Sequence, residues 1–171
     1  MLLTKPPKKL DGVSIPTDCK TWMRFGRIWS SQLLPAEKIR LTFRLLLKIE
    51  PFENDIDIEQ WMDKFLWFYR CGAELRDTPQ SKERLLDWEK DSASIWADFR
   101  MYARIDLDKD PLHWWEFMAL FESLPEDASI KQKISIRGVD LSKIKDNETR
   151  RHYAEMKALV ALDPPDEDDW W

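Results

Sequence analysis

The fold is decided by residues 110–123, which read DPLHWWEFMALFES. We expect Asp110 to cap a helix here and Pro111 to open it, because the first turn of a helix tolerates proline. The positions that follow are apolar almost without interruption, apart from His113, Glu116 and the two residues at the end. A surface helix carries many more polar residues than this. The segment is therefore predicted to be a helix that other helices surround or that a partner protein covers.

Apolar residues recur every three or four positions in six further segments, which is the period of a helix. These segments are residues 17–33, 35–50, 55–72, 83–104, 128–138 and 147–162. The chain also has only four glycines, which is few for tight turns and hairpins. We therefore predict an all-α fold, a helical bundle of about six to seven helices. In the longest segment, Trp88, Ile95, Trp96, Phe99 and Tyr102 are expected on the apolar side, and the charged residues 87–94 leave room for a break.

The chain is predicted to begin with a small β-hairpin over residues 1–16. Asp11-Gly12 lies between two short runs of strand-forming residues, and a type I′ turn favours this dipeptide because both central residues need a positive φ. The sequence thus divides into the hairpin, a helical domain over residues 17–162, and an acidic segment over residues 163–171 that contains Trp170 and Trp171.

Ten tryptophans are the most unusual feature of the composition. Most of those inside the helical domain are expected in the core, because an indole ring buries a large apolar area. Some are expected to anchor a protein partner, since tryptophan is enriched where proteins bind proteins. The candidate protein-binding residues are Trp67, Phe68, Trp88, Trp170 and Trp171. For Trp170 and Trp171, the preceding acids would attract the partner and the indoles would insert into it. The alternative is that these residues are a frayed terminus without a binding role.

Three aspartates alternate as the first ligands of a calcium loop do, at Asp106, Asp108 and Asp110. Such a loop needs glycine at its sixth position and a bidentate glutamate at its twelfth. Those positions hold Pro111 and Phe117. The aspartates are therefore interpreted as a polar loop between helices.

Other arrangements that could support metal binding or catalysis are incomplete. The pairs His113/Glu116 and His152/Glu155 run in the reverse order to the Glu-x-x-His pairs of metal-binding bundles. Cys71 has only the neighbouring arginine to lower its pKa, so a buried thiol is the better interpretation. No phosphate-binding loop or zinc spacing occurs in the sequence. We therefore expect no enzymatic activity, no cofactor and no metal site.

Charge is distributed in blocks along the chain. Residues 1–49 carry ten Lys/Arg against three acids, residues 50–129 nine against twenty, and residues 158–171 five acids and no base. Blocks of this kind suit contact between copies or a partner of mixed charge, unless folding mixes them in space. The overall charge of −5 does not fit nucleic-acid binding. Apolar runs are too short for a membrane span or a signal peptide, so we expect a cytoplasmic protein.

Four motifs in order carry a resemblance to one protein family. They are residues 17–25 (TDCKTWMRF), 67–72 (WFYRCG), 112–115 (LHWW) continuing to 124–127 (LPED), and 140–146 (DLSKIKD) running on through 150–153 (RRHY). Together they resemble the "gene product fifteen" family of long-tailed bacteriophages and of prophages of Gram-positive bacteria. The likeness covers most of residues 10–162.

This resemblance implies a role in building the phage tail. The family's gene lies in the tail module, between those of the tail-tube and tape-measure proteins, where tail assembly chaperones are encoded. The expected partners are therefore the tape-measure protein, the tail-tube protein and other copies of the chain, in the host cell cytoplasm, with no nucleic acid and no membrane. The family supplies no catalytic or ligand residues, and the acidic residues 166–171 depart from its pattern. Two alternatives are a minor subunit or connector retained in the tail, and interference with a host factor.

Overall fold

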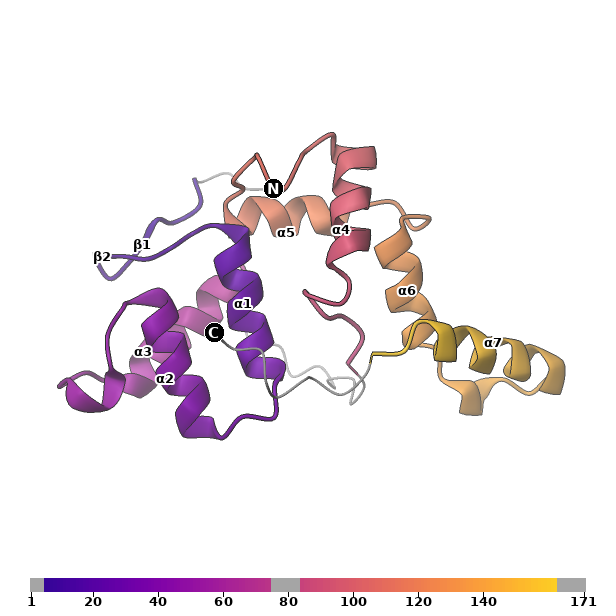
Figure 1. The fold of residues 1–171 in the computed structure, drawn as a ribbon, viewed down its shortest axis with the longest axis horizontal. Helices are drawn as coiled ribbons and strands as arrows, with labels where there is room; N and C mark the ends of the chain where they lie inside the picture. The colour runs from indigo at the N-terminus through magenta and orange to yellow at the C-terminus, as the bar shows by residue number, and fades with distance from the viewer. Residues whose placement is uncertain (1–4, 75–83, 163–171) are drawn as a thin grey trace. The chain divides into compact units, whose positions relative to one another are not determined.

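The computed structural model describes residues 5–74 and 84–162, which form two compact units. Residues 5–74 and 108–122 belong to the first unit, and residues 84–107 and 123–162 to the second. The predicted all-α fold with an N-terminal hairpin is confirmed (Figure 1). Elements of the first unit are β1 (Lys9–Leu10), β2 (Val13–Ser14), α1 (Cys19–Ser30), α2 (Pro35–Leu46), the 3-10 turn η1 (Pro51–Glu53), α3 (Ile58–Tyr69) and α5 (Trp114–Ser123). Elements of the second are α4 (Ser92–Asp98), the π-helical turn η2 (Phe99–Ala103), α6 (Ser129–Arg137), the 3-10 turn η3 (Leu141–Lys143) and α7 (Asn147–Leu159).

The local signals for the hairpin and for the first helix are confirmed. Strands β1 and β2 pair antiparallel, and the turn between them has φ of 47° at Asp11 and 80° at Gly12, as a type I′ turn requires. Asp18 caps α1, and its carboxylate accepts a hydrogen bond from the backbone N–H of Thr21 at 2.9 Å. After α3, Cys71 has φ of 56° and Gly72 has φ of 79°, and Gly72 N–H donates to the carbonyl of Trp67 at 3.0 Å, so the predicted glycine contributes to the end of the helix together with Cys71.

Buried aromatic rings fill the first unit. Trp22 stacks on Phe68 with ring centroids 4.4 Å apart, and Tyr69 stacks on Trp114 at 5.1 Å. Both interactions join α3 to another helix, so the unit holds one continuous aromatic core. Its side chains with no measurable exposure are Trp22, Phe25, Phe43, Phe65, Phe68, Trp114 and Phe117.

The two indoles at the start of α5 also bind the end of α3. Trp114 Nε1 donates to the carbonyl of Tyr69 at 2.8 Å, and Trp115 Nε1 donates to that of Phe68 at 2.9 Å. The last carbonyls of a helix lack donors from within the helix. Trp114 and Trp115 therefore donate to carbonyls at the end of α3 while they bury their own rings. One side of α5 is buried in this way, but Ala119 is exposed, so α5 is not surrounded on all sides as expected.

The predicted start of that helix is wrong. Helix α5 begins at Trp114, and Asp110 and Pro111 lie before it in a loop. The reason is a competing backbone interaction: Cys19 N–H donates to the carbonyl of Leu112 at 2.9 Å, and Trp114 N–H to that of Thr17 at 2.7 Å. These bonds hold residues 112–114 extended beside the start of α1.

The helix predicted over residues 83–104 is broken in the structure, at the charged residues 87–94 that left room for a break. Residues 84–87 have no regular structure and residues 88–91 form a turn, because the carboxylate of Asp87 accepts the N–H groups of Glu89 at 2.8 Å and Lys90 at 2.9 Å. Such side-chain bonds compete with helix formation. Helix α4 therefore starts at Ser92, and the π-turn η2 ends it with a bond from Arg104 N–H to the carbonyl of Phe99.

Helix α4 fixes the start of α6. Ala128 occupies the cap position of α6 and has no side-chain acceptor. The buried carboxylate of Asp98, in α4, replaces it and accepts from Ser129 N–H at 3.1 Å and Ile130 N–H at 2.8 Å. One helix therefore caps another within the second unit.

Arg137 fixes the end of α6. Its guanidinium makes two bonds to the carboxylate of Asp91, at 2.7 and 2.9 Å. It also donates to the carbonyls of Leu85 at 2.9 Å and Val160 at 2.6 Å. Arg137 and Asp91 are both buried. This one side chain thus joins the turn before α4, the start of α4, and the end of α7.

We expect Asp98→Ala to destabilise the second unit by about 1–2 kcal/mol, because two amides of α6 lose their acceptor. Asp98→Asn keeps one acceptor oxygen, so its loss should be smaller. Urea denaturation would measure the difference, and hydrogen exchange would place it at residues 129–132. Equal stabilities of the two variants would show that the carboxylate does not act as a cap.

Candidate protein-binding surfaces

The predicted protein-binding residues lie in different parts of the structure. Trp67 is 40% exposed on α3, with its ring packed edge-on against Trp115 at 5.4 Å. Phe68, the next residue, is fully buried against Trp22, so it belongs to the core and offers no surface. Trp88 is half-buried in the second unit. Trp170 and Trp171 lie outside the described residues.

The tryptophans of the helical domain are less buried than predicted. Only Trp22, Trp114 and Trp115 are buried, and Trp29, Trp61 and Trp88 are half-buried. The other two of these eight, Trp67 and Trp96, are exposed. Long side chains cover part of the surface rings, for example Lys64, whose Nζ lies 4.9 Å from the ring centre of Trp61.

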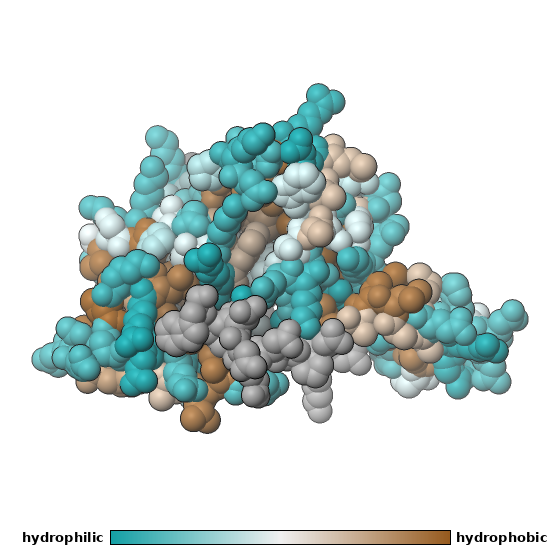
Figure 2. Space-filling model, in the orientation of Figure 1, coloured by the Kyte–Doolittle hydropathy of each residue, from teal (hydrophilic) through white to brown (hydrophobic). Residues whose placement is uncertain are grey.

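Three exposed hydrophobic side chains of the second unit, Trp96, Met101 and Tyr102, lie on α4 and η2, and part of this surface is a candidate binding face. We call it the α4 face and define it as Ala93, Trp96, Ala97, Arg100 and Met101. All five residues are exposed, Trp96 by 39% and Met101 by 72%. Residues three and four positions apart share one side of a helix. Ala93 and Ala97 therefore lie on the same side as Trp96 and Met101. Figure 2 shows pale and tan residues over this helix, against a mostly hydrophilic surround.

The helical period of the sequence predicted the wrong side for part of the α4 face. Ile95 and Phe99 are buried as expected, whereas Trp96 and Tyr102 are exposed and so were wrongly assigned to the buried side. Trp96 follows Ile95 directly, so either residue could be placed on the buried side of the helix. The helical period alone does not decide which of the two is buried. The spacing of Ala93, Ala97 and Met101 was the signal that could have shown a second apolar side.

The charged residue of the α4 face is Arg100, and the exposed Arg104 follows it in the chain. The only acid between residues 92 and 104 is Asp98, which is buried and caps α6. Arg100 and Arg104 are both exposed. The guanidinium of Arg100 lies over the ring of Trp96, 4.9 Å from its centre, and it pairs with Asp106 at 2.7 Å. The face therefore combines aromatic and thioether groups with a cation.

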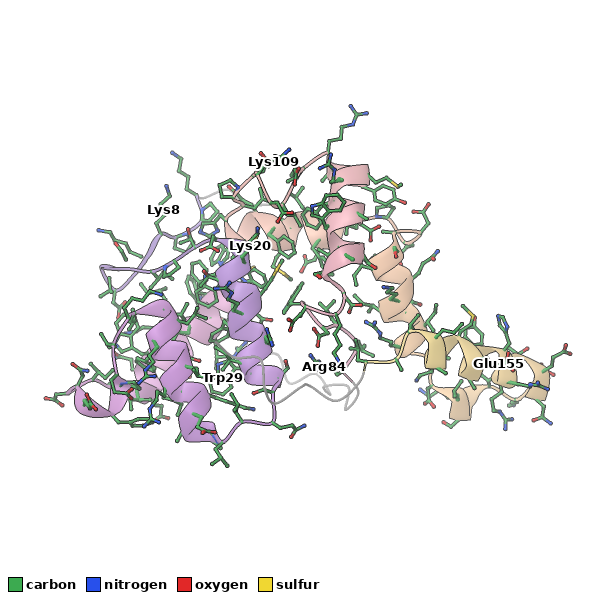
Figure 3. All side chains as sticks on the ribbon, viewed as in Figure 1. Lys8, Lys20, Trp29, Arg84, Lys109 and Glu155 are labelled. Atoms are coloured by element: carbon green, nitrogen blue, oxygen red, sulfur yellow. The ribbon has the colours of Figure 1, made fainter. Side chains whose placement is uncertain are left out.

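A pocket of about 480 Å³ lies in the first unit, which is within the usual range of ligand sites. It is lined by Lys5, Pro6 and Lys8 and by residues at or just before the starts of α1 and α5. Figure 3 labels one of them, Lys8. Two polar residues of the pocket have structural roles: Asp18 caps α1, and His113 bonds through Nε2 to the Pro7 carbonyl at 3.0 Å and through Nδ1 to Trp115 N–H at 3.1 Å.

Two further observations concern Cys71 and the possible metal ligands. Burial and the nearby charge of Glu122 raise the pKa of the Cys71 thiol to about 12, so the thiol stays protonated at neutral pH. Within residues 5–74 and 84–162, no group of three or more His, Cys, Asp or Glu side chains could hold a metal ion. In the same residues, none of the helices combines the length and hydrophobicity that a bilayer span requires.

Comparison with known proteins gives a match to a family model. A family model described as "Bacteriophage Gp15 protein" matches residues 11–162. No curated protein and no solved structure matches the chain. The family indicates a structural or tail-related protein of a bacteriophage. Because the match covers most of the sequence, the chain belongs to the bacteriophage Gp15 protein family.

Proposed function

We propose that the protein is a phage tail assembly chaperone, which binds the tape-measure protein, tail-tube subunits or both in the host cell cytoplasm. Membership of the Gp15 family supports a role in or near the tail. Binding of this kind requires a surface that accepts helices, and it requires no catalytic residue, metal or cofactor. A tape-measure protein, with its long apolar-striped helices, is the partner class that such a surface fits.

The α4 face is the observation that supports this proposal most directly. Ala93 and Ala97 let the backbone of a second helix approach closely, and Trp96 and Met101 on either side provide apolar contact area. Methionine adapts its shape to different partners, which suits a protein that must hold a repetitive helix at many positions. Arg100 would select segments that carry an acid beside their apolar stripe.

We expect co-expression with the phage's own tape-measure protein to yield a soluble complex. Replacing both anchors, Trp96→Ala with Met101→Ala, should cost about 2–4 kcal/mol of binding, so the soluble complex should fall more than tenfold. Size-exclusion chromatography of the lysate would measure it.

A matched control removes exposed hydrophobic residues outside the α4 face. Phe52 is 48% exposed and Leu159 is 86% exposed, so Phe52→Ala with Leu159→Ala removes a similar apolar area. This variant should keep the complex. A tape-measure protein that is equally soluble alone would refute the chaperone role.

One observation favours the alternative, a minor subunit or connector that stays in the tail. Helix α7 has no buried residue, and Leu159 near its end is the most exposed large hydrophobic side chain of the described residues. A permanent subunit could bury this helix against a neighbour. Mass spectrometry of purified virions separates the two roles, since a chaperone is absent from the particle and a subunit is present.

A further inference from the structure

We propose that the pocket of the first unit binds a short polypeptide segment of a partner protein, one that carries an acidic and a basic side chain beside an apolar one. The pocket lies in the first unit and the α4 face in the second, so this inference does not rest on the proposed function. Nothing in the fold requires the pocket to be filled by the chain itself.

Hydrogen bonds fix three walls of the pocket relative to one another. His113 Nδ1 accepts a backbone N–H, so Nε2 carries the ring proton and donates to the carbonyl of Pro7 at 3.0 Å. This bond ties the N-terminal arm, residues 5–8, to the start of α5. Two backbone bonds join residues 17–19 at the start of α1 to residues 112–114. The pocket is therefore formed before a ligand binds, as most ligand sites are.

Besides Asp18 and His113, three charged side chains line the pocket. Lys5 and Lys8 on the arm and Glu116 on α5 are all exposed. In the part of the chain that the structure describes, none of the three makes an ion pair or a hydrogen bond. The pocket thus has two unpaired cations on one wall and an unpaired carboxylate on another, and none of these groups has a structural role.

These charges favour a ligand that carries both signs. The carboxylates of Asp18 and Glu116 would repel a wholly anionic ligand, and the two lysines of the arm would repel a wholly cationic one. A segment with an acid toward the arm and a base toward α5 pairs with both walls. Pro6, Pro111 and Leu112 provide the apolar contact between them.

Size and exposure favour a segment of a longer chain. The volume of about 480 Å³ is that of a small-ligand site, so it accepts a few side chains and not a helix of several turns. Because Lys5, Lys8 and Glu116 are exposed, the charged groups of the ligand pair at the edge of the pocket. The ends of a polypeptide can continue from there into solvent.

Titration of the ¹⁵N-labelled full chain with blocked tripeptides tests this inference. The probes are acetyl-Glu-Leu-Lys-amide and acetyl-Lys-Leu-Glu-amide, since the direction of the segment is open. We expect saturable shifts at the amides of residues 17–20 and 112–117 with at least one of them. The uncharged acetyl-Gln-Leu-Gln-amide should bind about tenfold more weakly, because it makes no ion pairs.

Charge reversal in the protein gives the matched variants. Lys5→Glu with Lys8→Glu should weaken binding of the tighter tripeptide about tenfold, and Glu116→Lys should also weaken it. Lys9→Glu reverses an exposed lysine that does not line the pocket, so it should keep the affinity. All three reversals combined should invert the preference between the two tripeptides, a result that a purely structural role of these residues would not produce.

Other outcomes overturn the inference. Absence of saturable shifts with both tripeptides, or equal binding of the uncharged one, shows that the pocket does not select mixed charge. Unchanged affinity after the reversals shows that the ligand binds elsewhere. Tighter binding of 5-aminopentanoate, a small zwitterion, shows a small-molecule site instead of a polypeptide site. Trp96→Ala with Met101→Ala should leave tripeptide binding unchanged, so this proposal and the chaperone role can fail separately.

Discussion

Arg137→Met should destabilise the second unit by about 3–5 kcal/mol, which is the usual cost of removing one partner of a buried ion pair. The variant leaves the carboxylate of Asp91 buried without its guanidinium, and it also removes the donors to Leu85 and Val160. Arg84 also interacts electrostatically with Asp91, but its Nη2 already pairs with Asp87. Urea denaturation of the full chain would measure the loss.

The pattern of hydrogen exchange distinguishes this mechanism from a general loss of stability. Amides of α4, α6 and α7 should lose protection, and those of the first unit should keep it. Adding Asp91→Asn removes the unpaired charge, so the double variant should be more stable than Arg137→Met alone. A double variant that is less stable than the single one would show that the ion pair is not the source of the effect.

Trp114→Ala should destabilise the first unit by a similar amount, about 3–5 kcal/mol, because it opens a large cavity in the aromatic core. Trp114 has no exposed surface, stacks on Tyr69 and Phe117, and donates to the carbonyl of Tyr69. Trp114→Phe keeps part of the ring but leaves that carbonyl without its donor, so an intermediate loss is expected. Thermal unfolding followed by near-UV circular dichroism would measure both variants.

Trp67→Ala is the matched control in the same unit. Its ring is 40% exposed, so its removal leaves no closed cavity and should cost much less than the loss of Trp114. Similar losses for Trp67→Ala and Trp114→Ala would mean that the buried stack is not the main source of stability in this unit.

Local signals in the sequence predicted much of the fold. The hairpin, the caps of α1 and α3, and the turn at Gly72 each depend on a few neighbouring residues, so they could be read from spacing and residue type. The family resemblance rested on residues 10–162 and is confirmed over residues 11–162.

The errors arose where distant residues compete for the same backbone groups. The start of α5 is set by bonds to Thr17 and Cys19, almost a hundred positions earlier in the chain. The shortening of α4 depends on carboxylates at Asp87 and Asp91, and the second of these binds an arginine in another helix. A periodic pattern does not contain these partners, so it extended both helices too far.

The sequence predicted the type of residue at the candidate surface, but not which helix carries it. Exposed aromatic residues on a helical scaffold were expected, and Trp67 is one. The α4 face was missed because Trp96 lies one position from the buried Ile95, and rotating the helix by one residue exchanges buried and exposed positions.

Asp91, directly before α4, and Asp98, at its end, also determine the register between α4 and α6. Asp91 binds Arg137 at one end of α6, and Asp98 binds Ile130 at the other; both pairs of positions are seven residues apart. The helices are antiparallel, so sliding one past the other by a turn would break both sets of bonds at once. Apolar contacts alone would tolerate such a shift far better. The polar groups at the two ends therefore stabilise one alignment of α4 and α6 and destabilise alignments shifted by one turn.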